Sequence, residues 1–371
     1  AATSIRAARR RWRSAGARCP VGSLSRPVIM SPAISTGDRV LPAGGREATV
    51  GNALLDVRDL GKYFELSPRL GGHFLRGRRV LHAVDGVSFQ IEKGQTLALV
   101  GESGCGKTTL ARLVMRLVEP SFGAVFFSGR DVLGLDRSGV RWLRREMQIV
   151  FQDPYSSLNP RKTIEQIVGL PLKVHRIGTR AERRKRVTEL LEMVGLEPAH
   201  MRRYPHEFSG GQRQRIAIAR ALAVSPSLVI ADEPVSSLDV SIQAQVLNLL
   251  QALQRELALT YLFISHDLNV VELMSDKVAV MHAGKIVELG TTSEVFGEPM
   301  HPYTRALLAS VPSLESPGVL PLLEGELISP INPGPGCRFR SRCPLATAEC
   351  ARQDPELETR ARGHMVACIH V

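Results

Sequence analysis

A glycine-rich segment between a predicted strand and a predicted helix constrains the fold of this chain more than any other feature. Residues 101–108 read Gly-Glu-Ser-Gly-Cys-Gly-Lys-Thr, which fits the spacing G-x-x-x-x-G-K-[ST] of a phosphate-binding loop. The apolar run Thr96–Val100 predicts a buried strand before the loop, and Lys107–Leu117 predicts a helix after it. This order is the context that such a loop requires, and it favours an α/β fold around a mostly parallel sheet.

Each residue type in this loop has defined chemistry toward a polyphosphate. The glycines let backbone N–H groups turn toward phosphate oxygens, and the start of the following helix adds the positive end of its dipole. The Lys107 ammonium is expected at the β- and γ-phosphates, and the Thr108 hydroxyl is expected to ligate Mg²⁺. The predicted nucleotide contacts of the loop are Gly101, Ser103, Gly104, Gly106, Lys107, Thr108 and Thr109.

Two carboxylates follow a second apolar strand. The run Leu228–Ala231 leads directly into Asp232 and Glu233. A buried parallel strand is nearly all apolar, and acids at its carboxyl end lie at the ligand-binding edge of the sheet. Asp232 is expected to hold Mg²⁺, usually through water, and Glu233 to polarise an attacking water as general base. The two motifs together predict that the chain binds and hydrolyses ATP–Mg²⁺.

Composition excludes several classes of protein. The 371 residues are 44% apolar and 23% charged, which is typical of a globular chain. Residues 1–50 carry nine arginines against two acids, so they hold +7 of the net charge of +12 and the remaining chain holds +5. We therefore expect no nucleic-acid binding by the body of the protein. No apolar run approaches the ~18–20 residues that span a bilayer, so other chains must supply any spanning segments.

Three parts are expected along the chain. Residues 1–50 predict a disordered Arg-rich leader, for which a start assigned too early (with Met30 as the true start) is favoured over an organellar transit peptide. Residues 51–300 predict the ATPase domain, with a strongly charged helical subdomain at about 155–223. Residues 301–371 predict a C-terminal extension with clustered cysteines.

A short segment between the two nucleotide motifs points to one family. Phe208–Gln212, Phe-Ser-Gly-Gly-Gln, resembles the Leu-Ser-Gly-Gly-Gln signature of the ATP-binding-cassette (ABC) ATPases, with Phe208 where leucine is commoner. Other elements follow in the order of that family. Gln152 matches the Q-loop, and His266, after the predicted strand Tyr261–Ile264, matches the switch histidine. Ser236–Asp239 looks like the D-loop.

The resemblance covers about residues 54–370 and implies a fold and a set of roles. It implies a P-loop ABC nucleotide-binding domain: a mostly parallel RecA-like core sheet, an antiparallel β subdomain, an inserted α-helical subdomain and a small Cys-rich tail. Glu233, His266 and Gln152 would be catalytic, with Gln152 also near Mg²⁺. Phe64, rather than Tyr63, would stack on adenine. In the family two cassettes face head to tail, so the contacts with the ATP of a second cassette would come from Ser209, Gly210, Gly211, Gln212 and Asp239.

Within the family, the chain looks most like the ATPase subunits of dipeptide, oligopeptide and nickel importers. The stretches that carry this are 148–161, 203–215 and 301–312, and the first resembles the second of the two ATPase subunits of such systems. This implies a heterodimer (rather than a homodimer) of ATPases on two transmembrane permease subunits, fed by a peptide-binding protein, at the cytoplasmic face of the cell membrane. Uptake of nickel or another small solute is the alternative.

Other classes fit the sequence less well. A DNA-end ATPase of this fold would have a long coiled-coil insertion and a ribosome-associated one would have two cassettes, whereas this chain has one cassette and no such insertion. A protein that only senses ATP would have lost Glu233 or His266, and both are present. A GTPase would carry an N-K-x-D motif for guanine, which we do not find.

The cysteines near the end of the chain suggest a metal. They are separated by five, six and seventeen residues, which are wider gaps than the C-x₂₋₄-C pairs of zinc sites. A Cys₄ iron–sulfur cluster tolerates varied spacing, and related importers have similar tails, so a structural [4Fe–4S] cluster is expected. Zinc and unligated thiols stay open as alternatives. Arg338, Arg340 and Arg342 are expected to offset the cluster's charge, and the predicted ligands are Cys337, Cys343, Cys350 and Cys368.

Overall fold

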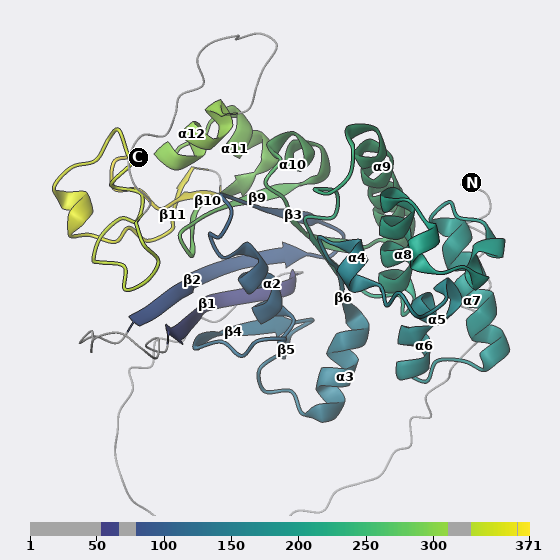
Figure 1. Cartoon of the computed structure of the whole chain (residues 1–371). Helices are drawn as coiled ribbons and strands as arrows, with labels where there is room; N and C mark the ends of the chain where they lie inside the picture. Colours follow the sequence, from purple (N-terminus) through teal and green to yellow (C-terminus); the bar gives the residue numbers. More distant parts are fainter. Residues whose placement is uncertain (1–52, 67–78, 311–327, 362) are drawn as a thin grey trace, which may run out of the picture. The chain divides into compact units, whose positions relative to one another are not determined.

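The computed structural model describes residues 53–66, 79–310, 328–361 and 363–371, which belong to one compact unit (Figure 1). The predicted leader at 1–50 lies outside these residues. Two sheets and a set of helices make up the described part, and they agree with the predicted α/β class.

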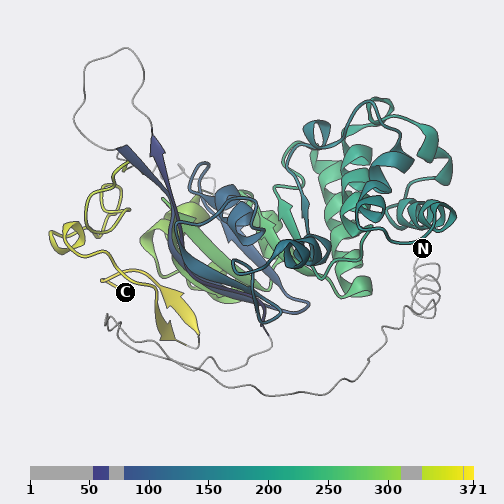
Figure 2. The ribbon, with the colours of Figure 1, turned by 90° about the horizontal axis from the view of Figure 1, so that it is seen from below.

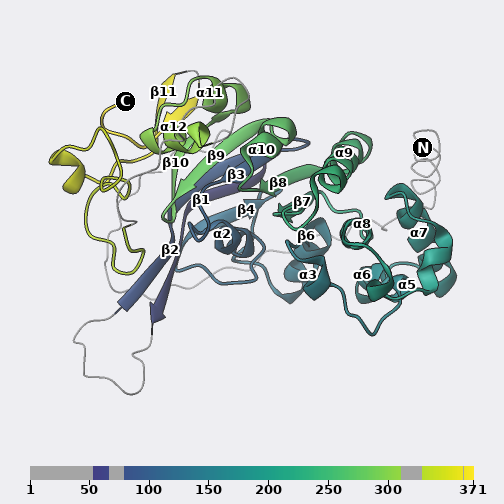
Figure 3. The same ribbon diagram turned by 45° about the horizontal axis from the view of Figure 1, so that its top comes forward.

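The larger sheet carries the two nucleotide motifs. Its strand order is β11-β12-β10-β9-β3-β8-β7-β6, and its five strands from β9 to β6 run parallel (Figure 3). Strands β3 and β7 are buried along their whole length, which explains why both are continuous apolar runs. The bounds are β3 Thr96–Val100, β6 Met147–Val150, β7 Leu228–Asp232, β8 Thr260–Ile264, β9 Lys277–His282, β10 Lys285–Thr291, β11 Glu358–Ala361 and β12 His364–Val366.

The smaller sheet is antiparallel, in the order β2-β1-β4-β5. Buried and exposed residues alternate along the second half of β2, as expected where one face packs on a core and the other meets solvent. The bounds are β1 Ala53–Leu66, β2 Arg79–Glu92, β4 Phe122–Phe127 and β5 Arg130–Asp131.

The helices divide into a group around the sheets and a group inserted between β6 and β7. In the inserted group α8 contacts α4, α5 and α7 as well as β6, and these teal helices gather at one side of the strands (Figure 2). The bounds are α2 Lys107–Val114, α3 Arg137–Glu146, α4 Pro154–Ser157, α5 Ile164–Val168, α6 Leu170–Val174, α7 Arg180–Met193, α8 Gly210–Leu222, α9 Val240–Leu257, α10 Leu268–Met274, α11 Thr292–Gly297 and α12 Pro302–Ala309.

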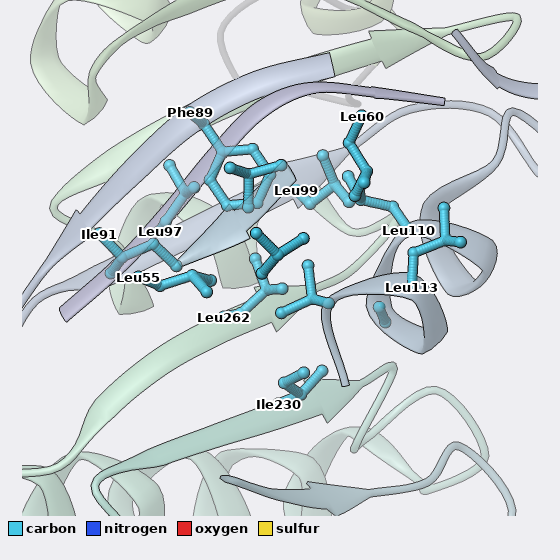
Figure 4. Close-up of a cluster of buried hydrophobic side chains, with 14 of the residues drawn as sticks. Leu55, Leu60, Phe89, Ile91, Leu97, Leu99, Leu110, Leu113, Ile230 and Leu262 are labelled. Carbon is cyan, nitrogen blue, oxygen red and sulfur yellow. The ribbon is translucent and has the colours of Figure 1, made fainter. Parts of the chain in front are cut away.

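One apolar cluster joins both sheets and α2. Side chains from β1 and β2 meet those of β3, β7 and β8, and α2 packs into the same cluster (Figure 4). Burial of each such leucine or isoleucine stabilises the fold by about 1.5–3 kcal/mol. The cluster fixes β3 and α2 against one another, and the loop between them is the predicted phosphate site. The labelled residues are Leu55, Leu60, Phe89, Ile91, Leu97, Leu99, Leu110, Leu113, Ile230 and Leu262.

The C-terminal extension is built into this core. Strand β12 pairs antiparallel with β10 of the larger sheet, and Ile331 forms a bridge with Leu81 of β2. The His82 N–H donates to the Pro330 carbonyl at 2.9 Å, and Phe339 is buried in one apolar cluster with Val100 of β3 and Val280 of β9. The extension therefore packs against the ATPase core.

Helix α2 is shorter than its sequence predicts. The expected end at Leu117 is wrong, because the helix ends at Val114 and Met115 is its C-cap. Arg116 then takes a left-handed conformation with φ of 50°, which stops the helix. The Arg116 guanidinium donates to the carbonyls of Val132 and Leu135, which holds this turn in place.

Candidate nucleotide site

The backbone of the phosphate loop requires glycine at two positions. Gly101 has a φ of 147°, and a Cβ there would lie 2.1 Å from the carbonyl oxygen of Met281. Gly106, at the N-cap of α2, has a φ of 112°, and a Cβ would lie 2.2 Å from the Ala83 carbonyl oxygen. Both contacts are with backbone that cannot move aside cheaply, so the pattern of glycines follows from packing as well as from phosphate binding.

Lys107 is buried inside the loop that it follows. Its Nζ donates to the carbonyl oxygens of Gly101 at 2.7 Å and of Glu102 at 2.9 Å, and its residue is only 6% exposed. The loop thus presents the ammonium in a fixed position beside the phosphate site. Cys105 Sγ lies 3.8 Å from Lys107 Nζ, and burial raises the pKa of its thiol, which disfavours the reactive thiolate.

A pocket of about 290 Å³ opens over this loop. Phe64 lies on its wall, whereas Tyr63 stacks on His82 at 4.0 Å and donates its hydroxyl to Asp85 at 2.6 Å. Of these two neighbouring rings, only that of Phe64 lines the pocket. Predicted residues that line the pocket are Phe64, Ser103, Gly104, Gly106, Lys107, Thr108, Thr109, Gln152 and Glu233, joined by the unpredicted Leu81, His82, Ala83, Cys105, Ala283, Gly284 and Pro330.

Hard oxygen ligands suited to Mg²⁺ lie at the edge of this pocket. The Thr108 hydroxyl donates to Asp232 Oδ1 at 3.3 Å. Burial raises the pKa of the Asp232 carboxyl, an effect that the Thr108 hydrogen bond opposes and the neighbouring Glu233 reinforces. A hydroxyl from α2 and a carboxylate from the end of β7 are the type of donor set that Mg²⁺ uses beside phosphate oxygens. These residues fit the predicted metal.

Three predicted catalytic side chains meet at one carboxylate. Gln152 Nε2 donates to Glu233 Oε2 at 2.7 Å, and His266 Nδ1 lies 3.2 Å from the same oxygen. Glu233 has a φ of 47°, a strained conformation for this residue type, and its N–H donates to the Ile264 carbonyl at 3.0 Å. Strain of this kind persists where the surroundings fix it, and here it turns the carboxylate toward the pocket and toward Gln152 and His266.

The signature segment and the D-loop lie together, and the lining of the pocket does not include them. Ser209 caps α8, because its Oγ accepts from the Gln212 N–H at 3.3 Å while Gln212 Oε1 accepts from the Ser209 N–H at 3.1 Å. Asp239 caps α9 through the Ile242 N–H at 3.0 Å. Gly211 faces Ile242, so a Cβ on it would lie 2.2 Å from Cγ2. The structure therefore separates the predicted site into two surfaces of one chain.

Comparison with known proteins now decides the family. Residues 84–236 match the ABC transporter family model, and residues 287–350 match the oligopeptide/dipeptide transporter C-terminal region. The oligopeptide transport ATP-binding protein AppF of Bacillus subtilis is 52% identical over 320 residues, which cover 85% of this chain and 96% of that protein. The chain belongs to the ABC transporter ATPases.

Other relatives of this ABC ATPase agree. The oligopeptide transport ATP-binding protein OppF of Escherichia coli is 52% identical and covers 86% of this chain and 96% of its own length. The solved structure of cbiO1 from Clostridium perfringens, part of the ABC transporter complex cbiONQ, superposes with a TM-score of 0.57 at 31% identity, covering 67% of this chain and 92% of that one. The predicted resemblance, fold class and ATPase activity are confirmed.

A solved dimer is also similar. The cassette MJ0796 in a dimeric post-hydrolysis state with ADP and phosphate has a TM-score of 0.57 at 29% identity, covering 64% of this chain and 98% of that one.

Among the described residues of the present ABC ATPase, no helix has both the length and the apolar character needed to cross a membrane.

The four cysteines of the extension line one small cavity with His370. Its volume of about 10 Å³ is close to what one water needs. Cys350 Sγ lies 3.2 Å from His370 Nε2, and burial raises the pKa of Cys337 and Cys343. Among the residues that the structure describes, no group of three or more His, Cys, Asp or Glu side chains is arranged to hold a metal ion.

The arginines beside these cysteines have other partners than expected. Arg338 pairs with Asp85 and donates to the Ala283 carbonyl, and Arg342 forms two hydrogen bonds with Glu102. Two of the three guanidinium groups thus bind carboxylates of the ATPase core. The expectation that they serve to offset the charge of a cluster is corrected for these two, because opposite charges of the core lie within direct reach.

Proposed function

We propose that this chain is the ATP-hydrolysing subunit of an importer of dipeptides or oligopeptides, bound peripherally at the cytoplasmic face of the cell membrane. The observation that carries the proposal is the 52% identity to an oligopeptide transport ATP-binding protein over 96% of that protein's length. The match includes the C-terminal region as well as the cassette. The chemistry would be carried by Glu233, with its carboxylate between Gln152 and His266.

ATP binding, Mg²⁺ binding and proton transfer would be divided among these residues. Lys107 and the loop N–H groups would bind the β- and γ-phosphates, and Thr108 and Asp232 would hold Mg²⁺, which supplies charge neutralisation when bound. Glu233 would accept a proton from the attacking water, and His266 and Gln152 would orient that carboxylate and the water. Phe64 would stack on the adenine ring.

A second cassette would complete each site. The N-terminus of α8 offers a dipole end and the N–H groups of Gly210 and Gly211, which the capping box of Ser209 and Gln212 does not use, and it lies outside the pocket lining of its own chain. Facing the pocket of a partner, it would bind the γ-phosphate there, with Asp239 beside it. We propose a heterodimer with a related ATPase subunit, because the importers that this chain resembles use two different ATPases.

The permease subunits would dock on the inserted helices. A groove of about 560 Å³ runs along α5, α6 and α7. Its wall combines the exposed apolar side chain of Leu170, 41% exposed, with the basic Lys173, Arg180, Arg183 and Arg184. An apolar surface rimmed by cations suits a short amphipathic segment with acidic residues. Gln152 follows β6, which contacts the same helical group, and this would link docking to catalysis.

We also propose that the cysteines Cys337, Cys343, Cys350 and Cys368 hold a structural [4Fe–4S] cluster, with zinc as the alternative metal. The support is that all four line one cavity, although the cavity is small and the side chains would have to move outward around a cluster. The test is anaerobic purification followed by iron analysis and absorbance near ~400 nm. Protein that is colourless and contains zinc but no iron would contradict the cluster.

The transport proposal is tested by reconstitution of the chain with its permease and ATPase partners in lipid. Hydrolysis of ATP is compared with and without a binding protein loaded with peptide or with nickel. Stimulation by peptide supports the proposal, and stimulation by nickel alone would identify nickel, in place of peptide, as the transported solute. If no membrane subunit co-purifies with the chain, a soluble role takes the place of transport.

A further inference from the structure

Every polar group of Glu102, a variable position of the phosphate loop, has a partner in the structure. Its N–H donates to the Tyr303 hydroxyl at 2.9 Å, and its carbonyl accepts from Lys107 Nζ at 2.9 Å. Its two carboxylate oxygens accept from the two terminal nitrogens of Arg342 at 2.9 and 3.0 Å. Two of these three partners, Tyr303 and Arg342, belong to the C-terminal extension.

We propose that Arg342 and Tyr303 are positioning residues for ATP, which hold Glu102 so that its carbonyl fixes the ammonium of Lys107. Neither residue lines the nucleotide pocket as the structure describes it, so both act through Glu102. The proposal gives the extension a part in nucleotide binding.

The contact has the geometry of a strong interaction. A guanidinium that binds both oxygens of one carboxylate has two parallel charge-assisted hydrogen bonds, which fix the orientation as well as the distance. The Arg342 side chain is 9% exposed and that of Glu102 is 28% exposed, so water screens the pair less than it would at the surface. Removal of one partner would leave a partly buried charge unpaired.

The extension itself holds Arg342 in place. Arg342 lies between Cys337 and Cys343, and its N–H donates to the Phe339 carbonyl at 3.0 Å. The Phe339 ring packs against the Tyr303 ring with centroids 5.4 Å apart. The two partners of Glu102 therefore lie in one packed unit, and a change in the cysteine segment moves both of them together.

The chemical consequence concerns Lys107. Its ammonium donates to the carbonyl oxygens of Gly101 and Glu102. If Glu102 loses its anchors, this part of the loop gains freedom, and ATP must then order the loop on binding. Binding that has to order a segment is weaker, so the affinity for ATP should fall more than the rate at saturation.

The experiment measures ADP–Mg²⁺ affinity, and KM and kcat for ATP, on the full chain in its assembled transporter. We expect Arg342→Ala and Glu102→Gln each to weaken ADP binding and raise KM about tenfold, which corresponds to about 1.4 kcal/mol, because each change removes both charge-assisted hydrogen bonds of the pair. The double variant should lose no more than either single one. Arg342→Lys keeps the positive charge but cannot form two parallel hydrogen bonds with the carboxylate. Its ADP affinity should therefore lie between that of Arg342→Ala and that of the native chain.

Two controls separate positioning from folding. Arg305→Ala removes an arginine of α12 that donates to the Pro299 carbonyl and not to the phosphate loop, and it should leave ADP affinity unchanged. Tyr303→Phe removes only the hydroxyl and tests the same idea where Arg342→Ala does not fold. Unchanged ADP affinity in a folded Arg342→Ala or Tyr303→Phe protein overturns the proposal, as do additive losses in the double variant.

Discussion

The amide of Gln152 donates to the carboxylate of Glu233 across 2.7 Å, although the two residues follow different strands and are 81 positions apart in the sequence. The ring of His266 approaches the same oxygen at 3.2 Å. Two partners on one carboxylate oxygen fix the orientation of that carboxylate before water binds. A general base needs such a fixed position relative to the proton that it accepts.

Glu233→Gln should remove most ATP hydrolysis while it preserves ATP binding. The amide keeps the shape and the hydrogen bond with Gln152 but cannot accept a proton, and loss of a general base costs ~10²–10⁴-fold in rate. The measurement is steady-state hydrolysis alongside equilibrium ADP affinity. Glu192→Gln, on an exposed position of α7, is the matched control and should change neither. If Glu233→Gln retained its rate, the partner cassette would carry the chemistry.

Phe64→Ala should raise KM for ATP about tenfold, because it removes an aromatic surface worth about 1.5 kcal/mol from the pocket wall. Tyr63→Phe is the companion variant, since Tyr63 faces His82 and Asp85. It should leave KM unchanged. A KM that rises in Tyr63→Phe but not in Phe64→Ala would assign adenine stacking to Tyr63 instead of Phe64.

Gly211→Ala should abolish hydrolysis without weakening ADP binding to the single chain. The added methyl would lie 2.2 Å from Ile242 Cγ2 and would push the start of α8 away from α9, at a cost of about 1–3 kcal/mol. The signature would then no longer fit the nucleotide of a second cassette. Gly297→Ala is the control, because no atom lies within 4 Å of the Cβ it would add. Equal rates for the two variants would count against the role of the signature.

Stability should fall as the pH is lowered from 7 to 5. Burial, and secondly the neighbouring His282, lowers the pKa of His301 to about 3 in the folded protein. The unfolded histidine takes up a proton near pH 6.5, so the unfolded state binds more protons below that pH. His301 alone should cost roughly 2 kcal/mol of unfolding free energy between pH 7 and 5.

Denaturant unfolding at several pH values measures this effect. His301→Asn keeps a side-chain acceptor for the N-cap of α12 but does not titrate, so it should flatten the dependence on pH whatever its effect at pH 7. His206→Gln changes an exposed histidine and should leave the slope as it is. A slope that is the same in His301→Asn and in the native chain would refute the assignment.

Local motifs made much of the nucleotide site predictable from the sequence. The loop at 101–108 and the two acids at the end of β7 are each recognisable from neighbouring residues in the chain. The same holds for the cap at Ser209 and for Gln152, which follows β6. Their chemistry is encoded within a few residues of each motif. The pairing of Phe64, rather than Tyr63, with the pocket followed from the family pattern and agrees with the direction in which each ring points.

Long-range contacts were not predictable in this way. The sequence predicts a role for Arg342 only beside the cysteines, and Glu102 stands at an x position of the loop motif, so nothing near either residue in the sequence indicates that the two are paired. The same is true of β12, which pairs with β10, and of Pro330 at the pocket wall. The end of α2 depends on the left-handed turn at Arg116, which two distant carbonyls hold.

The distance in sequence between Glu102 and Arg342 also sets an order of events on the ribosome. The two residues are 240 positions apart, so at ~5–20 residues per second roughly 10 to 50 s separate their synthesis. The phosphate loop, both acids and the signature emerge within that interval, while Glu102 still lacks its partners. If Arg342 and Tyr303 position Glu102 as proposed, a nascent chain carries all the nucleotide motifs but reaches its full affinity for ATP only after the extension has emerged and packed.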